Sequence, residues 1–157
     1  MVLIAQPPGV RATRDGGTWK FARGTSGTNF VMNDFAALER SLGKYVMEIV
    51  RAEIFYKMKR AESGKLAYGE GREFDVQQMH AAQDVLELRL SDRTGDRGNR
   101  LHMRFFFSEP LHLPGLLVGL GLLWKRPGEI DLPMQTQFAK QAAVRLQEYS
   151  QRADYGL

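Results

Sequence analysis

The chain has 157 residues, which is enough to bury a hydrophobic core as one domain. It contains no cysteine, which excludes disulfides, thiolate nucleophiles and cysteine-based zinc sites. The formal net charge of +4 is compatible with an acidic partner such as nucleic acid, but the 22 basic residues are mixed with 18 acidic ones, so charge alone is a weak indication.

Apolar runs are short throughout the chain. The patch at residues 1–5 ends at Pro7 and Pro8 and is shorter than a signal peptide. The run from Leu116 to Trp124 is far below the roughly 18 residues that a membrane helix needs. We therefore expect a cytoplasmic protein with no membrane partner.

Residues 1–30 form a basic N-terminal arm that is rich in glycine, threonine and arginine. Two glycine-containing segments bracket residues 18–22, which we interpret as a first strand flanked by turns. The simplest role for the arm is that of a solvated tail.

The next segment has the periodicity of a helix. Apolar residues recur at spacings of three and four from residue 35 to residue 58, and Asn33 or Asp34 is placed to cap the N-terminus. Gly43 is expected to divide this stretch into a short helix and a longer one ending near Glu62, which would form an antiparallel pair if the break is sharp. From Asp75 to Ala82 the pattern indicates one or two further helical turns.

Three apolar runs at residues 86–90, 101–107 and 116–126 then predict three consecutive strands, because turn residues bound each run. A last helix is expected after them, with Pro133 in its first turn. Its apolar stripe would cover one face of the sheet and consists of Met134, Phe138, Ala142, Leu146 and Tyr149. A short tail at residues 153–157 follows.

Charged side chains stand inside these apolar strands, where a buried strand normally avoids charge. Side chains alternate across a strand, so the leucines of residues 86–90 are expected to face the helices. The opposite face would then carry Glu87, Arg89, His102, Arg104, Gly119, Gly121 and Lys125, with Arg126 at its edge.

If the strands are neighbours at the usual spacing of about 5 Å, Arg89, His102, Arg104 and Lys125 converge on one patch. Converging cations suit a phosphodiester, because they can neutralise its charge and stabilise the extra charge of a phosphoryl transition state. Gly119 and Gly121 would let a ligand approach the sheet closely. A second interpretation also fits: a solvated sheet face carries such charges routinely, Glu87 pairs with Arg104, and the glycines admit a packed helix.

Other catalytic patterns are poor matches. The three histidines form no HxxxH or HxH pair, so we expect no metal, and no nucleotide-binding loop or serine nucleophile motif indicates a cofactor or a hydrolase triad.

The order of these pieces resembles the HigB branch of the RelE superfamily, the ribonuclease toxins of bacterial and phage toxin–antitoxin pairs. The matching marks are Asn33-Asp34-Phe35 at the start of a helical hairpin, the strand Leu86-Glu87-Leu88-Arg89, the strand Arg104-Phe105-Phe106-Phe107, an apolar strand ending in Lys125-Arg126, and a last helix that contains Ala139 and finishes near Tyr149. The resemblance covers residues 31–152, by order and pattern.

The resemblance implies an α+β fold in which a helical hairpin and a C-terminal helix pack on a small twisted antiparallel sheet. It also implies a metal-independent endoribonuclease that cleaves messenger RNA, commonly in the ribosomal A site, and a cognate antitoxin protein as partner. In such a reaction the substrate's own 2′-hydroxyl attacks the adjacent phosphate and leaves a cyclic phosphate and a 5′-hydroxyl.

Carried over by position, the resemblance assigns phosphate binding to Arg89, Arg104 and Lys125 or Arg126. Proton transfer falls to His102, whose ordinary pKa suits it best, or to Glu87, which has a comparable position. Some relatives place a tyrosine or histidine near the start of the last helix, where this chain has Leu132, Pro133 and Met134. That departure leaves a non-catalytic nucleic-acid- or protein-binding protein on the same scaffold as the alternative.

Overall fold

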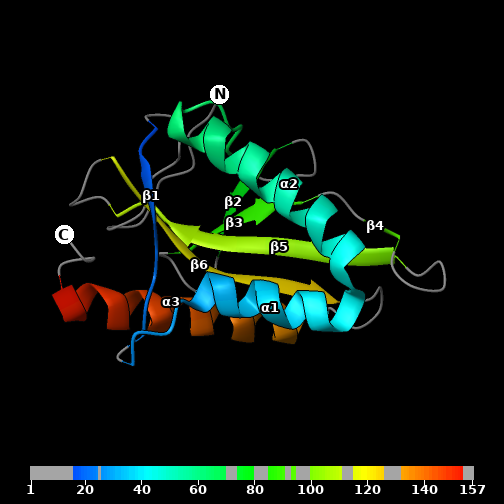
Figure 1. Ribbon diagram of the computed structural model, residues 1–157. Coiled ribbons are helices and arrows are strands. Elements are labelled where there is room, and N and C mark those ends of the chain that lie inside the picture. Colours follow the sequence, from blue (N-terminus) through cyan, green and yellow to red (C-terminus); the bar gives the residue numbers. More distant parts are fainter. Residues whose placement is uncertain are drawn as a thin grey trace.

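The computed structural model describes residues 16–24, 26–69, 74–79, 85–90, 93–94, 100–110, 115–125 and 132–153. These residues have an α+β fold, as the sequence predicts (Figure 1). The elements in chain order are β1 (Thr18–Phe21), α1 (Phe30–Leu42), α2 (Lys44–Glu62), β2 (Val76–Gln78), β3 (Leu86–Arg89), β4 (Arg93–Thr94), β5 (Arg100–Ser108), β6 (Leu116–Lys125) and α3 (Leu132–Ala153).

The strands form one mixed sheet in the order β1-β6-β5-β3-β2, with β4 paired to the first residues of β5. The three strands predicted from apolar runs are therefore neighbours. β1 runs parallel to β6 and all other pairs are antiparallel, so the prediction of an antiparallel sheet is wrong at β1. Only strands joined by short loops are constrained to be antiparallel. In the chain, α1, α2 and the strands β2 to β5 lie between β1 and β6, so this constraint does not apply to them.

Helices cover both faces of the sheet (Figure 1). On one face, α1 and α2 pack against residues that include Leu86, Leu88 and Phe105. On the other face, α3 packs against residues that include Phe106 and Leu123. Burial on both sides explains why β6 is a nearly continuous apolar run.

The first strand belongs to the core and is no solvated tail. Ala22, directly after β1, is fully buried, and the Trp19 indole Nε1 donates a hydrogen bond to the carbonyl of Met58 in α2 at 2.9 Å. Residues 1–15 of the arm lie outside the described residues.

The helical pair is present, and Gly43 separates α1 from α2 with a positive φ of 90° that favours glycine. The predicted cap is wrong. Asn29 caps α1, because its side chain accepts a hydrogen bond from the backbone N–H of Met32 at 3.1 Å. Asn33 and Asp34 therefore lie inside the helix, and Asp34 is available for another contact.

The helical turns predicted between Asp75 and Ala82 are also wrong where the structure describes them. Residues 76–78 form β2, which pairs with residues 86–88 of β3. The local sequence has no strand pattern of its own, so pairing with β3 decides its conformation. Residues 80–82 lie outside the described residues.

A β-bulge interrupts the pairing of β5 with β6. Phe106 pairs with Gly121 and Phe107 with Gly119, which leaves Leu120 as an extra residue on β6. The two glycines therefore lie in different environments. A Cβ at Gly119 would meet the Phe21 ring at 2.8 Å, whereas one at Gly121 would meet the Arg145 guanidinium of α3.

The expectation that both glycines open one face to a ligand is wrong, because protein side chains fill both positions. At Gly121 a packed helix does so, as the second interpretation of the sequence proposed.

An ion pair closes the edge of β6 beyond the residues that pair with β1. Arg145 in α3 lies 3.0 Å from Asp34 in α1 and donates to the carbonyl of Leu120, while Asp34 accepts from the N–H of Leu122, each at 3.0 Å. The guanidinium also stacks on the ring of Phe30, 4.8 Å from its centroid. This pair ties both helices to the sheet edge.

Candidate functional site

The pairing register places the four predicted cations on one face of the sheet. Arg89 of β3 is the direct partner of Arg104 of β5, and His102 of β5 is the direct partner of Lys125 of β6. His102 and Arg104 are two residues apart in one strand and share a face. The side chain of Lys125 and the whole of Arg126 lie outside the described residues.

The face that carries the cations is also packed against a helix. Phe106 and Leu123 lie on it and pack against α3, and the rings of Phe106 and Phe138 are 5.1 Å apart between centroids. The arginines therefore lie on a face that is partly covered by the last helix.

Glu87 lies between the two arginines. Its Oε1 is 3.1 Å from Nε of Arg104 and 3.9 Å from Nε of Arg89. Like charges directly opposite each other in a sheet repel, and this carboxylate offsets the repulsion. The pairing of Glu87 with Arg104 that the sequence suggested is confirmed.

The three side chains differ in depth. The Glu87 side chain is 8 % exposed, whereas those of Arg89 and Arg104 are each 23 % exposed. The carboxylate is thus buried beside the two guanidiniums, which keep part of their surface toward solvent. In this arrangement Glu87 fixes the arginines, and an incoming anion would meet them first.

Burial raises the pKa of Glu87 above its ordinary value, while the positive charges of Arg104 and then Arg89 partly oppose this rise. A carboxyl group of raised pKa beside two cations is a feature of sites that transfer protons. Its low exposure argues for a role in positioning the arginines as well.

Further contacts hold each guanidinium. Nη2 of Arg89 donates to Oε1 of Gln77 in β2, and Nη1 of Arg104 donates to the carbonyl of Met103 at 2.7 Å. The sequence does not predict Gln77 as a site residue, because its pattern indicates helical turns at residues 75–82. The strand at residues 76–78 pairs with β3 and places Gln77 directly opposite Glu87.

The described part of the chain contains no cluster of three or more histidine, aspartate or glutamate side chains that could hold a metal ion. Among the same residues, no helix combines the length and the apolar character of a membrane span. No protein-family model matches this sequence, and no curated protein matches it either.

Proposed function

We propose that this protein is a toxin-like endoribonuclease that binds an RNA phosphate at Arg89 and Arg104 and cleaves the adjacent bond. The observation that supports this proposal is the register, in which Arg89 faces Arg104 and, one step along, His102 faces Lys125. Two guanidiniums and further cations on one face suit a phosphodiester and the charge that develops on it during transfer.

In the proposed reaction the 2′-hydroxyl of the RNA loses its proton to a base and attacks the neighbouring phosphorus. The bond from phosphorus to the 5′-oxygen breaks, that oxygen takes up a proton, and a cyclic phosphate remains. Arg89 and Arg104, with Lys125 or Arg126, stabilise the phosphate charge. His102 is the first candidate for proton transfer and Glu87 the second, since Glu87 is deeply buried.

Messenger RNA on the ribosome is the proposed substrate, in the cytoplasm and without a metal or other cofactor, and an antitoxin protein is the proposed partner. The order of helical hairpin, strands and last helix supports assignment to a RelE-like fold of the HigB branch. The α+β fold, with α1 and α2 on one face of the sheet and α3 on the other, is compatible with this assignment at the level of fold class.

Induction in a bacterium tests the function and the site together. The wild-type protein should arrest growth and produce new 5′-hydroxyl ends in translated RNA. Arg104→Ala combined with Lys125→Ala should relieve both effects. The matched control is Lys44→Ala combined with Arg60→Ala, which removes the same charge from α2 on the opposite face and should leave toxicity intact.

Toxicity that persists in the Arg104→Ala/Lys125→Ala variant would refute the site. Growth arrest without new RNA ends would refute the ribonuclease.

A protein that binds nucleic acid without cleaving it is the second candidate. Glu87 already offsets part of the charge of the arginine pair, which favours binding over the stabilisation of a highly charged transition state. This candidate predicts salt-sensitive retention of single-stranded RNA, lost in Arg104→Ala, with the RNA recovered intact.

A further inference from the structure

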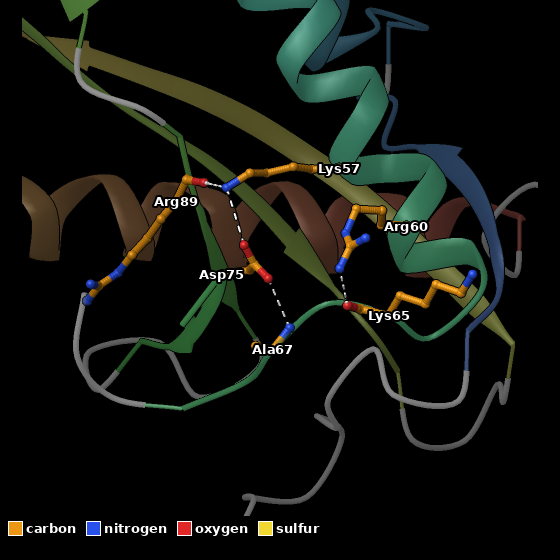
Figure 2. Close-up of polar contacts among 6 residues, drawn as sticks. All are labelled: Lys57, Arg60, Lys65, Ala67, Asp75 and Arg89. Carbon is orange, nitrogen blue, oxygen red and sulfur yellow. Dashed lines mark hydrogen bonds and ion pairs between the residues drawn. The ribbon is translucent and has the colours of Figure 1, made fainter. Parts of the chain in front are cut away.

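Arg89 is anchored from the opposite face of the sheet. Nζ of Lys57 in α2 donates a hydrogen bond to the backbone carbonyl of Arg89 at 2.6 Å. Figure 2 shows the Arg89 side chain extending away from Lys57. The main chain of Arg89 is therefore held from the side of α2, while its guanidinium makes contacts on the other side of the strand.

Asp75 completes this anchor. Its backbone carbonyl accepts the N–H of Arg89 at 2.9 Å, and its Oδ1 lies 3.4 Å from Nζ of Lys57. Its other carboxylate oxygen accepts the N–H of Ala67 at 3.0 Å (Figure 2). Both backbone polar groups of Arg89 are therefore satisfied by the pair formed by Lys57 and Asp75.

This anchor lies where the strand pairing stops. The ladder between β2 and β3 ends at Val76 and Leu88, one residue before Arg89. Lys57 and Asp75 act as one additional step of the ladder, and without them the end of β3 would lose its hydrogen bonds on this side. The contacts of Arg89 with Glu87 and Gln77 depend on the position of that strand end.

We propose that Lys57 is a positioning residue for Arg89, acting through the Arg89 main chain, and that Asp75 orients its ammonium group for this task. Where it concerns RNA, this inference rests on the proposed function. The placement of Arg89 against Glu87 and Arg104 can be tested without any RNA.

The test compares Lys57→Met with Arg60→Met. Arg60 is a matched control, because it lies on the same helix and also donates to a backbone carbonyl, that of Lys65 at 2.9 Å, without any link to Arg89 (Figure 2). The readout is the titration of the Glu87 carboxyl carbon by NMR. Arg104 and Arg89 both lower the pKa of Glu87, so displacement of Arg89 should raise it further.

Lys57→Met should raise the pKa of Glu87, Lys57→Arg should keep it near the wild-type position, and Arg60→Met should not move it. Should Lys57→Met fail to fold, Asp75→Asn replaces it and should shift the titration in the same direction by less. An unchanged titration in the variant tested, or an equal shift in Arg60→Met, overturns the proposal.

A second comparison separates positioning from the charge of Lys57 itself. In an Arg89→Met background, where no guanidinium is left to position, Lys57→Met should leave the Glu87 titration unchanged. A shift of undiminished size in this background would mean that Lys57 acts directly by its charge, against the proposal. His102 and Lys125, which share the face with Glu87 by register, are unaltered throughout.

The RNA readout follows from the same variants. Lys57→Met should weaken the binding of a single-stranded RNA oligomer in the same direction as Arg89→Met and by a smaller factor, and Lys57→Arg should restore most of the loss. If the wild-type protein neither binds nor cleaves RNA, the proposed function fails, while the Glu87 titration still decides the role of Lys57.

Discussion

Arg145 and Asp34 lie 111 positions apart in the chain, yet their side chains meet at 3.0 Å and hydrogen-bond to alternate residues of one strand edge. Both side chains are mostly buried, so loss of one partner leaves the other, and a backbone group, unpaired away from water.

We therefore expect Arg145→Met to lower the free energy of unfolding by about 2 to 4 kcal/mol. The exposed Lys140 on the same helix provides the control, and Lys140→Met should change stability by less than about 0.5 kcal/mol. Urea unfolding measures both. Equal effects of the two substitutions would show that the ion pair contributes nothing specific.

Gly121→Ala should destabilise the fold by about 1 to 3 kcal/mol, because the new methyl group would overlap the Arg145 guanidinium and lie 2.9 Å from Oδ2 of Asp34. The penalty should become smaller in an Arg145→Ala background, where the guanidinium is absent and only Oδ2 of Asp34 remains close to the new methyl group. A double-mutant cycle by chemical denaturation measures this coupling, and additive effects of the two substitutions would contradict the packing seen at Gly121.

Asn29→Ala should cost about 1 kcal/mol, because it removes the side-chain acceptor for the Met32 N–H at the start of α1. The matched substitution Asn33→Ala lies at an exposed position inside the helix, where alanine is the better helix former, and should be neutral or stabilising. Thermal unfolding of the two variants distinguishes the caps. The opposite order would favour the cap that the sequence suggested.

Glu87→Gln should change how stability depends on pH. The pKa of Glu87 is raised in the folded protein from its ordinary value of 4.5. As the pH rises through the interval between the ordinary and the raised value, the unfolded chain loses its proton first, so the folded state binds more protons and the free energy of unfolding falls.

The stability of the wild-type protein relative to Glu87→Gln should therefore decrease as the pH rises through that interval, and stay constant below and above it. Urea unfolding of both proteins across the acidic and neutral range measures the difference. A relative stability that increases with pH would mean that the two arginines outweigh burial and that the pKa is lowered.

Much of the sheet could be predicted from the sequence, because apolar runs bounded by turn residues are local signals. Such runs predict the positions of β3, β5 and β6. They also predict that Glu87 and Arg89 share one face of β3, while the leucines between and beside them face the other side. The pairing of Glu87 with Arg104 follows once adjacent strands are assumed.

The features of the fold and of the site that the sequence does not predict depend on contacts between residues far apart in the chain. β2 has a strand conformation only because β3 offers it a partner, and Asp34 looks like a cap until Arg145 is placed beside it. Gln77 contacts Arg89 from β2 and Lys57 contacts it from α2. No local pattern reveals that these two elements lie beside the end of β3. The arginine site is thus visible in the sequence, whereas its supporting residues are not.

The extra residue at Leu120 has a consequence for every position after it. Inserting one residue reverses the parity of a strand, so residues 121–125 point to the opposite side from the one that a count from Leu116 gives. Lys125 shares a face with His102 because of this reversal. If β6 kept Leu120 but paired with β5 without the bulge, Lys125 would instead fall on the face beneath α1 and α2, and Trp124 would fall on the arginine side.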